Sequence, residues 1–422
     1  MLAAVLAVAS GLIIDVHRAV AAAASPGAFG VSGPAAAPAP PPAPTFTRDI
    51  APIFYKHCTT CHRPGQIAPM SLLSYKDARP WSRSIRARVA NRTMPPWFAD
   101  EGHRPLAGER RLNDNELMTI LAWVDGGAIE GSPADLPPEP AYAKEDWQIG
   151  HADAVFQLPR EFPVPASGQV EIQYFEVPTN FTEDKWIQAV EVRPGDQAHV
   201  HHVLMYHRDT PLSTRSNPED ETATLGSSLT VYASGADPLV FPEGMAKKIP
   251  AGSVLIFEMH YTTNGNEGRD RTRLALRFAK EPPKLEVHAM SISNAKFAIP
   301  PGAANHRVRA AISYNEPFSI LAIVPHAHRR GKSYQYRLLY EDGREETILS
   351  VSRYNWLWES SYTFEKPVQV PPRTTIEIIG TFDNSAGNKA NPDPKSEVRW
   401  GWDPASREMM FSYIVFAMPR KD

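Results

Sequence analysis

Short segments in which apolar and polar residues alternate fill the chain after residue 147, and they restrict its fold more than any other feature. Examples are residues 170–174, 274–278 and 334–340. Successive side chains of a strand point to opposite faces, so runs of this kind, separated by Gly, Pro, Asn and Asp, predict packed antiparallel sheets. Because the stretch is long for one β-sandwich, we expect two sandwiches, over residues 147–285 and 286–422.

Composition limits the class of protein. The chain has 422 residues, of which 42% are hydrophobic and 22% charged, which is typical of a globular protein with two or three domains. The net charge is −3 at pH 7, so no basic face for nucleic acid is expected. Its two cysteines both precede residue 62, so the strand region must be stabilised by its core without disulfides.

Residues 1–25 combine an apolar run with small residues of the kind that signal peptidase accepts, which predicts a signal peptide and a periplasmic or secreted protein. No Lys or Arg precedes the run, and Asp15, His17 and Arg18 interrupt it. An uncleaved N-terminal membrane anchor is therefore the alternative. Residues 26–44 are rich in Pro and Ala and predict a semi-extended tether.

The sequence Cys58-Thr-Thr-Cys61-His62 matches the C-x-x-C-H pattern of covalent haem c attachment, in which two thioethers hold the porphyrin and the histidine binds its iron. A redox dithiol and half of a zinc site are the alternatives. A dithiol motif would follow a strand, but residues 47–54 have helical periodicity with Thr47 as the expected cap. A zinc site would need further cysteines, so we expect one covalent haem c.

The sixth haem ligand is expected to be Met94, whose Pro-rich loop resembles the axial methionine loop of class I cytochromes c, with Met70 as the alternative. Residues 113–124 begin with a capping-box pattern, carry an apolar stripe and end at two glycines, as expected of a closing helix. We therefore predict a small all-α cytochrome c domain over residues 45–131. Residues 132–146, with several prolines, predict a linker.

Histidines cluster at three places in the strand region. His326 and His328 follow an apolar run and would share one face of an extended chain, where two imidazoles can begin a metal site; a solvated strand end is the alternative. The other candidates are His199, His201, His202, His260 and the neighbouring pair Met409 and Met410. Strand geometry alone favours His199 with His201 as a pair, since His201 and His202 point apart unless the strand twists or bulges.

The series His201-His202, His260-Tyr261, His326-x-His328 and Glu408-Met409 resembles the copper type II, ascorbate-dependent monooxygenases. That family includes the peptidylglycine α-hydroxylating and dopamine β-hydroxylating enzymes. The resemblance covers about residues 145–420, and its four motifs occur in the family's order, which makes the set more specific than any single motif.

The resemblance implies two copper ions, held on two jelly-roll-like sandwich domains that face each other across a solvent-filled cleft. His201, His202 and His260 would hold an electron-transfer copper, although His199 remains a possible substitute. His326, His328 and Met409 would hold the copper that binds O2; Met410 is the alternative to Met409, and a soft thioether favours Cu(I). Tyr413, four residues after Met409, matches a tyrosine of the family and is expected to be catalytic.

Val324 stands where the peptide enzymes carry an arginine that binds the substrate carboxylate, so a peptide substrate is not supported. The expected function is a haem c- and copper-dependent monooxygenase that hydroxylates a C–H bond of a small organic substrate with O2. Electrons would come from the haem or from an external donor, either an ascorbate-like reductant or a redox protein. The alternatives are a non-enzymatic periplasmic copper/haem electron-transfer protein, and a haem c carrier whose β region is a binding module.

Overall fold

The computed structural model describes residues 42–142, 147–209, 226–233, 237–358 and 360–421. The chain divides into two compact units, 1–42 and 43–422, and the second is described here. The expected signal peptide and nearly all of the tether lie outside the described residues. Among the helices that are described, none is long and apolar enough to cross a membrane.

The helical region occupies the N-terminal part of the second unit. Its elements are η1 (Phe46–Ile50), α1 (Ala51–His57), α2 (Tyr75–Ala78), η2 (Arg79–Trp81), α3 (Ser82–Ala90), α4 (Asp114–Asp125) and η3 (Pro133–Asp135). The capping box is confirmed: Asn113 accepts from the Glu116 backbone N–H, and the Glu116 carboxylate accepts from that of Asn113. The expected cap at Thr47 is wrong, because the helical turn already begins at Phe46 and Asp49 accepts the Thr45 backbone N–H at 2.6 Å.

Aromatic side chains form the centre of the helical region. Phe46, Phe54 and Trp123 are buried and in mutual contact, with ring centroids 6.1–6.3 Å apart. The Trp123 indole N–H donates to the Ile129 carbonyl at 2.9 Å, which fixes the chain just beyond α4. This packing holds α1, and with it the C-x-x-C-H motif at its end, against the closing helix.

Strands make up most of the remaining chain. The first group is β1 (Ala154–Gln157), β2 (Phe162–Val164), β3 (Gln173–Pro178), β4 (Lys185–Arg193), β5 (Val200–Arg208), β6 (Ser227–Ala233), β7 (Leu239–Val240), β8 (Met245–Ile249), β9 (Val254–Tyr261), β10 (Gly268–Asp270) and β11 (Arg273–Phe278). The second group is β12 (Leu285–Ser293), β13 (Ala298–Ile299), β14 (His306–Tyr314), β15 (Phe318–His326), β16 (Gly331–Leu339), β17 (Glu345–Val351), β18 (Tyr362–Val370), β19 (Thr374–Phe382), β20 (Val398–Arg399) and β21 (Phe411–Pro419).

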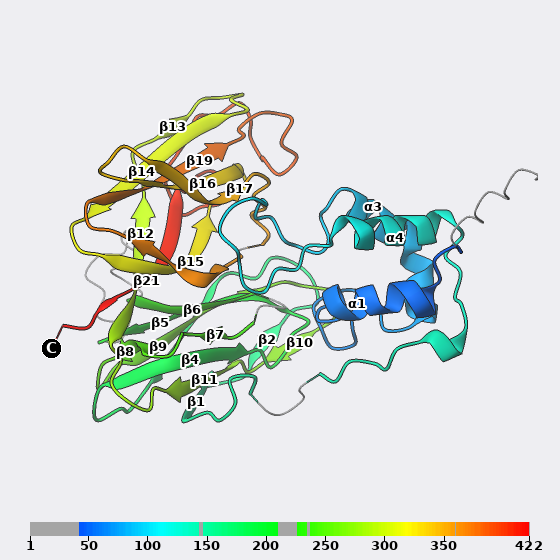
Figure 1. Cartoon of the computed structure of the whole chain (residues 1–422), viewed down its shortest axis with the longest axis horizontal. Helices are drawn as coiled ribbons and strands as arrows, with labels where there is room; N and C mark the ends of the chain where they lie inside the picture. The colour runs from blue at the N-terminus through cyan, green and yellow to red at the C-terminus, as the bar shows by residue number, and fades with distance from the viewer. Residues whose placement is uncertain (1–41, 143–146, 210–225, 234–236, 359, 422) are drawn as a thin grey trace, which may run out of the picture. The chain divides into compact units, whose positions relative to one another are not determined.

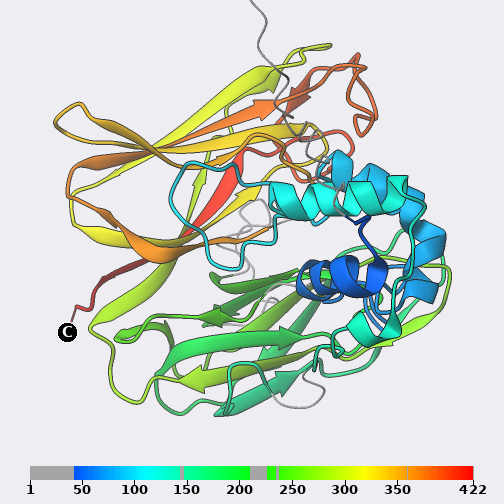
Figure 2. The same ribbon diagram turned by 45° about the vertical axis from the view of Figure 1, so that its right-hand side comes forward.

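Each group forms two packed layers. In the first group the strand orders are β1-β11-β4-β8 and β3-β9-β5-β6, and their facing side chains, such as Val190, Leu274, Met205 and Phe257, share one buried core. In the second group β12-β21-β15-β18 packs against β14-β19-β16-β17. Parallel pairing of β8 with β12 joins one layer of each group into a continuous sheet. Figures 1 and 2 show the two groups one above the other, with the helices to one side.

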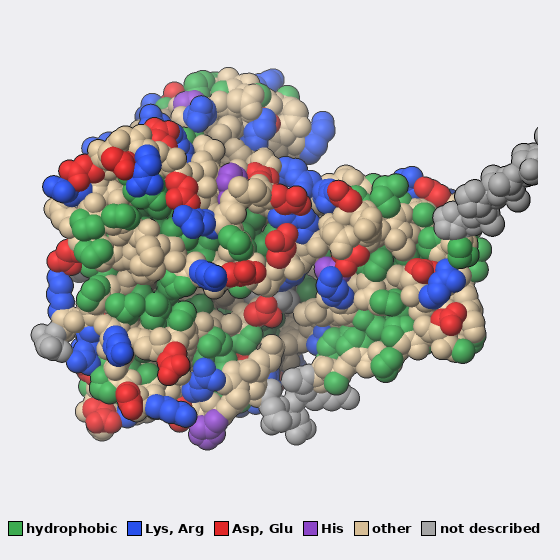
Figure 3. Space-filling view, in the orientation of Figure 1, with side chains coloured by type: hydrophobic (Ala, Val, Ile, Leu, Met, Phe, Trp, Pro, Cys, Tyr) green, Lys and Arg blue, Asp and Glu red, His purple; other side chains and the backbone are tan. Residues whose placement is uncertain are grey.

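The chain is therefore mainly β with a small N-terminal helical region, as expected from the sequence. The strand expected over residues 274–278 lies in β11, and the one over 334–340 matches β16 except for its last residue. The strand expected over 170–174 begins only at Gln173. On the face shown in Figure 3, acidic and basic side chains are interspersed, so neither sign dominates it.

The segment between α3 and α4 differs from its expected place within a separate haem domain. Trp97, Phe98 and Leu106 are buried in the core of the second strand group, and the Trp97 ring meets that of Tyr362 at 5.5 Å. Leu106 also forms an isolated antiparallel bridge with Phe364. Residues between α3 and α4 thus pack into the second strand group, although they precede residue 131, the expected end of the helical domain.

Candidate haem and copper sites

The haem motif lies at the C-terminal end of α1. The Cys58 backbone N–H donates to the Phe54 carbonyl at 2.8 Å, and that of His62 donates to the Cys58 carbonyl at 2.9 Å, so the motif forms a tight turn continuing the helix. Both cysteine side chains are half-buried. Burial, with smaller effects from the charges of Cys61 and Glu116, raises the pKa of Cys58 to about 12. The two thiols are neutral in this setting and lie close together.

The His62 ring is oriented by a backbone carbonyl. Its Nδ1 lies 3.3 Å from the Met70 carbonyl oxygen, which places the proton on Nδ1 and leaves Nε2 as an electron-pair donor. Burial lowers the pKa of His62, which favours the neutral imidazole that metals require. These are the conditions for an axial haem ligand.

A cavity of about 450 Å³ adjoins the motif. It is lined by both cysteines, His62 and Met94 from the helical region, and by His201 and Trp358 from the strands. Met70, the alternative ligand, instead packs against the helical core. Met94 therefore shares the cavity with His62, while Met70 contributes its carbonyl oxygen to orient the ring. The residues present fit one covalent haem, which Cys58 and Cys61 would hold through thioethers and for whose iron His62 and Met94 would be the ligands.

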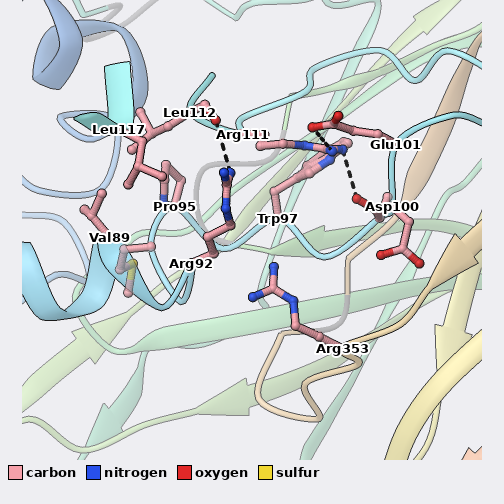
Figure 4. Close-up of a pocket in the computed structure, with 12 residues that line it drawn as sticks. Val89, Arg92, Pro95, Trp97, Asp100, Glu101, Arg111, Leu112, Leu117 and Arg353 are labelled. Carbon is pink, nitrogen blue, oxygen red and sulfur yellow. Dashed lines mark hydrogen bonds and ion pairs between the residues drawn. The ribbon is translucent and has the colours of Figure 1, made fainter. Parts of the chain in front are cut away.

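The loop that carries Met94 is held on both sides. The Thr93 and Met94 backbone N–H groups both donate to the Arg88 carbonyl, at 2.9 and 3.2 Å. A smaller cavity beside this loop is shown in Figure 4, where Arg111 forms an ion pair with Glu101 at 2.5 Å. Arg353, from the second strand group, lines the same cavity and donates to the Asn91 carbonyl at 3.2 Å. Hydrogen bonds therefore hold the Met94 loop both to α3 and to Arg353 of the second strand group.

Three histidines of the first strand group come together on β5 and β9. His202 pairs in register with His260, and their rings stack at 3.9 Å between centroids. An irregularity in the pairing between Val200 and His202 turns His201 toward its neighbour, so that the two Nδ1 atoms lie 2.8 Å apart. The strand bulges here, which is the condition under which the sequence allowed His201 and His202 to come together.

His199 does not join this group. Its Nδ1 lies 2.7 Å from an Asp196 carboxylate oxygen and its Nε2 lies 3.1 Å from the Asn266 carbonyl. Both ring nitrogens are engaged by protein oxygens, so neither is available to a metal in this arrangement. The pair of His199 with His201 that strand geometry favours is not formed.

Glu258 is a site residue that the sequence reasoning missed. It is buried, two residues before His260 on the same face of β9, and one carboxylate oxygen lies 2.7 Å from His260 Nε2. A carboxylate on one ring nitrogen orients a ligand histidine and leaves the other nitrogen for a metal. The i, i+2 spacing on a strand was the signal in the sequence that could have identified it.

The second group lies where β15 ends. His326 is the last residue of β15 and His328 follows it, and the two rings lie near each other, with centroids 5.5 Å apart and planes at 84°. His328 Nδ1 lies 3.3 Å from the Arg407 carbonyl. Tyr334 donates its hydroxyl to the His326 carbonyl at 2.5 Å, which fixes the end of the strand.

Glu408 connects this turn to Met409. Its buried carboxylate accepts the backbone N–H groups of His328, Arg330 (2.9 Å) and Met409 (2.8 Å). Burial raises the pKa of Glu408 to about 7, although these hydrogen bonds and His326 favour its charged form. In the sequence, Glu408 is singled out only as part of the Glu408-Met409 motif. In the structure, its carboxylate joins the turn that carries His328 to the segment that carries Met409.

The two methionines of the motif lie in different surroundings. Met410 is part of the hydrophobic core of the second strand group, whereas Met409 is equally buried but lies outside that core. The structure therefore gives Met410 a packing role and leaves Met409 next to Glu408 and the histidine turn.

Both histidine groups lie on layers that face each other. Tyr206, Val254 and Ile256 of the first strand group pack against Val324 and Tyr413 of the second. Along β5 and β9 these side chains share a face with His202 and His260, and along β15 Val324 shares a face with His326. The Tyr206 and Tyr413 hydroxyls lie 3.3 Å apart, so Tyr413 contacts the opposite layer directly.

The ligand sets are not arranged around a metal in this structure. Within the described residues, no group of three His, Cys, Asp or Glu side chains is placed to hold a metal ion. The donor chemistry nevertheless fits copper, because one set offers three imidazoles in contact and the other offers two imidazoles beside a buried thioether.

Comparison with known proteins adds little. No protein-family model matches the chain, and no curated protein matches it. Solved structures that overlap with it include an infectious bursal disease virus Gx strain structure, 10% identical, which covers 64% of this chain and 72% of its own, with a TM-score of 0.19. Another is PBCV-1 VP54 fitted into the virophage Sputnik, 9% identical over 66% and 97%, with a TM-score of 0.26. Values this low carry no argument about this chain.

Proposed function

We propose that this protein is a haem c- and copper-dependent monooxygenase, with a cytochrome c domain and two β-sandwich copper domains, that hydroxylates a C–H bond of a small organic substrate. One observation carries the proposal. His62, His260 and His328 each have one ring nitrogen on a protein oxygen, the arrangement typical of ligand histidines. The first belongs to the haem motif and the others to the two copper motifs. The leader expected over residues 1–25 supports a periplasmic or secreted location.

In this proposal His201, His202 and His260 hold one copper, and His326, His328 and Met409 hold the other. Bound copper supplies the binding and reduction of O2, and covalent haem c supplies electrons, with an external reductant as the alternative source. The chain's own residues position the ligands: Glu258 orients His260, and Glu408 fastens the segment of His328 to that of Met409. His201 lines the haem cavity, which makes the first copper set the nearer electron acceptor.

The test is metal content with spectroscopy. The copper-reconstituted protein should contain two coppers per haem, and its Cu(II) EPR spectrum should show two components. His201→Ala and His326→Ala should each remove one component and one copper. His151→Ala, on the exposed surface, is the matched control and should retain both. Fewer than two coppers in the unmodified protein, or unchanged spectra in both ligand variants, would contradict the two-site assignment.

A non-enzymatic copper/haem electron-transfer protein is the second candidate. The contact between Tyr206 and Tyr413 favours it, because this contact joins the facing layers directly and closes part of the space between them. Oxygen consumption separates the two functions. A monooxygenase reduced by excess ascorbate should consume O2 faster when a suitable substrate is added, and Met409→Ala should abolish that increase while retaining the haem spectrum. A carrier would show no substrate-dependent uptake.

A further inference from the structure

A third cavity, of about 240 Å³, lies between the two strand groups. Its walls are largely apolar and come from β6, β12, β15 and β21, with Val231, Val324 and Val415 among them. Tyr413 and the indoles of Trp97 and Trp358 also line it. Its volume is below the roughly 300 Å³ at which pockets for drug-sized ligands begin, so it suits a small molecule.

Lys247 of β8 lines this apolar cavity and has no counter-ion in contact. The residue is 4% exposed, and across the described part of the chain its ammonium forms no hydrogen bond or ion pair. Burying an unpaired ammonium is costly, and lysines are rarely this buried without a partner. Its neighbour Lys248 points the other way and is paired with Asp184 at 2.7 Å. Of these two adjacent lysines of β8, only Lys247 lines the cavity, and only Lys247 has no ion-pair partner among the described residues.

The charged groups around Lys247 do not replace a partner. Burial lowers the pKa of Lys247 to about 8, and Glu286 offsets this only in part. His207 and His288 lie near Lys247, and because burial lowers the pKa of both, neither adds a charge of either sign at neutral pH. Arg110 and the exposed Asp237 also line the cavity, one of each charge. The Lys247 ammonium is thus the buried cation and hydrogen-bond donor that the cavity offers to a ligand.

We propose that this cavity binds a small organic carboxylate, with its carboxylate on Lys247 and its apolar body against Val324, Val415 and Tyr413. The cavity is next to His326, which follows Val324 by two residues on the same face of β15. As far as the bound acid is the substrate of the monooxygenase, this inference rests on the proposed function. The cation comes from β8, at a position that no motif in the sequence identified.

The experiment measures binding of benzoate and, as its neutral counterpart, benzamide to the full-length haem protein. Quenching of Trp97 and Trp358 fluorescence reports occupancy, and calorimetry gives the affinity. Benzoate should bind more tightly than benzamide. Lys247→Met, which keeps the length of the side chain, should weaken benzoate binding about ten-fold or more and leave benzamide unchanged. Lys248→Met is the matched control and should change neither.

The melting temperature and the copper content distinguish a loss of benzoate binding from a loss of folding or of the copper sites. Lys247→Met removes an unpaired buried charge, so its melting temperature should be no lower than that of the unmodified protein. Equal benzoate affinity in Lys247→Met and the unmodified protein, or tighter binding of benzamide, would overturn the proposal. If benzoate binds through Lys247 but the protein fails to hold two coppers, the anion site stands and its role as a substrate site falls. If two coppers bind but benzoate does not, only the substrate class is refuted.

Discussion

The histidines of this protein differ in how the fold engages their ring nitrogens. His199 has both nitrogens on protein oxygens, whereas His62 and His260 have one each. A ring nitrogen that donates its N–H to a protein oxygen has no lone pair for a metal, so a histidine engaged by oxygen acceptors at both nitrogens is not placed to be a ligand. This distinction, which sequence spacing does not show, separates structural from candidate ligand histidines here.

The two methionines near the haem motif give a matched pair of variants. Met94→Ala should remove the sixth ligand, lower the haem reduction potential and let exogenous imidazole bind at low concentration, because a thioether ligand favours the reduced iron. Met70→Ala should leave the sixth ligand, the reduction potential and the affinity for imidazole nearly unchanged, since Met70 orients His62 through its backbone carbonyl. Redox titration and imidazole titration give the comparison. A potential that moves in Met70→Ala alone would reverse the assignment.

His207 predicts a dependence of stability on pH. It is buried, neither ring nitrogen has a hydrogen-bond partner among the residues that the structure describes, and burial, helped by the charge of Lys247, lowers its pKa to about 3. Between that value and the unfolded pKa of about 6.5 the unfolded chain binds more protons, so stability is complete above about pH 6.5 and falls as the pH drops toward 3. The full effect is about 5 kcal/mol, at about 1.4 kcal/mol per pKa unit.

His207→Leu should remove this part of the acid sensitivity. Urea denaturation at pH 7 and at pH 5 measures it: the loss of unfolding free energy between the two should be smaller in His207→Leu. His151→Leu, on the exposed surface, should behave like the unmodified protein. The same loss in all three proteins would show that His207 is already protonated, or partnered, in the folded state.

At the scale of elements, the segment between α3 and α4 links the helices to the strands. Trp97→Ala should destabilise the protein by about 3 kcal/mol, the cost typical of removing a large buried aromatic ring. It should also loosen the Met94 loop, which lies three residues earlier, and so shift the haem potential. Trp81→Ala is the control, because Trp81 is exposed on the helical region. Denaturant titration and redox titration check both effects; a stable variant with an unchanged potential would contradict the role of the segment.

Elements with a strong local signal could be predicted from the sequence. The capping box at Asn113 and the alternating segment in β16 follow from residue type and spacing within a few positions. The bulge before His202 could not be predicted, because it depends on how β5 pairs with β9, and it decides where His201 points. Insertion of Trp97 into the second core and the three-way role of Glu408 are also long-range, so no local pattern reports them.

At the scale of the whole molecule, the parallel pairing of β8 with β12 joins the two strand groups through backbone contacts. Facing side chains such as Tyr206 and Tyr413 add a second connection. We expect the strand groups to unfold together, as one calorimetric transition, even though each has its own core. Tyr413→Phe should leave the transition single, because the backbone pairing remains. Two resolved transitions in the unmodified protein would show that the groups are thermodynamically independent.

The cavity beside the haem motif has a consequence for how the protein matures. Cys58 and His62 lie early in the chain, but His201, Thr262 and Trp358, which close the same cavity, lie far behind them. In the proposed haem protein, a porphyrin joined to the cysteines before the strands form would meet only the helical part of this cavity. One that arrives after the strands have packed would have to pass walls already in place. Because the cysteines precede the strands in the chain, synthesis from the N-terminus would give the proposed attachment an interval before the rest of the cavity closes.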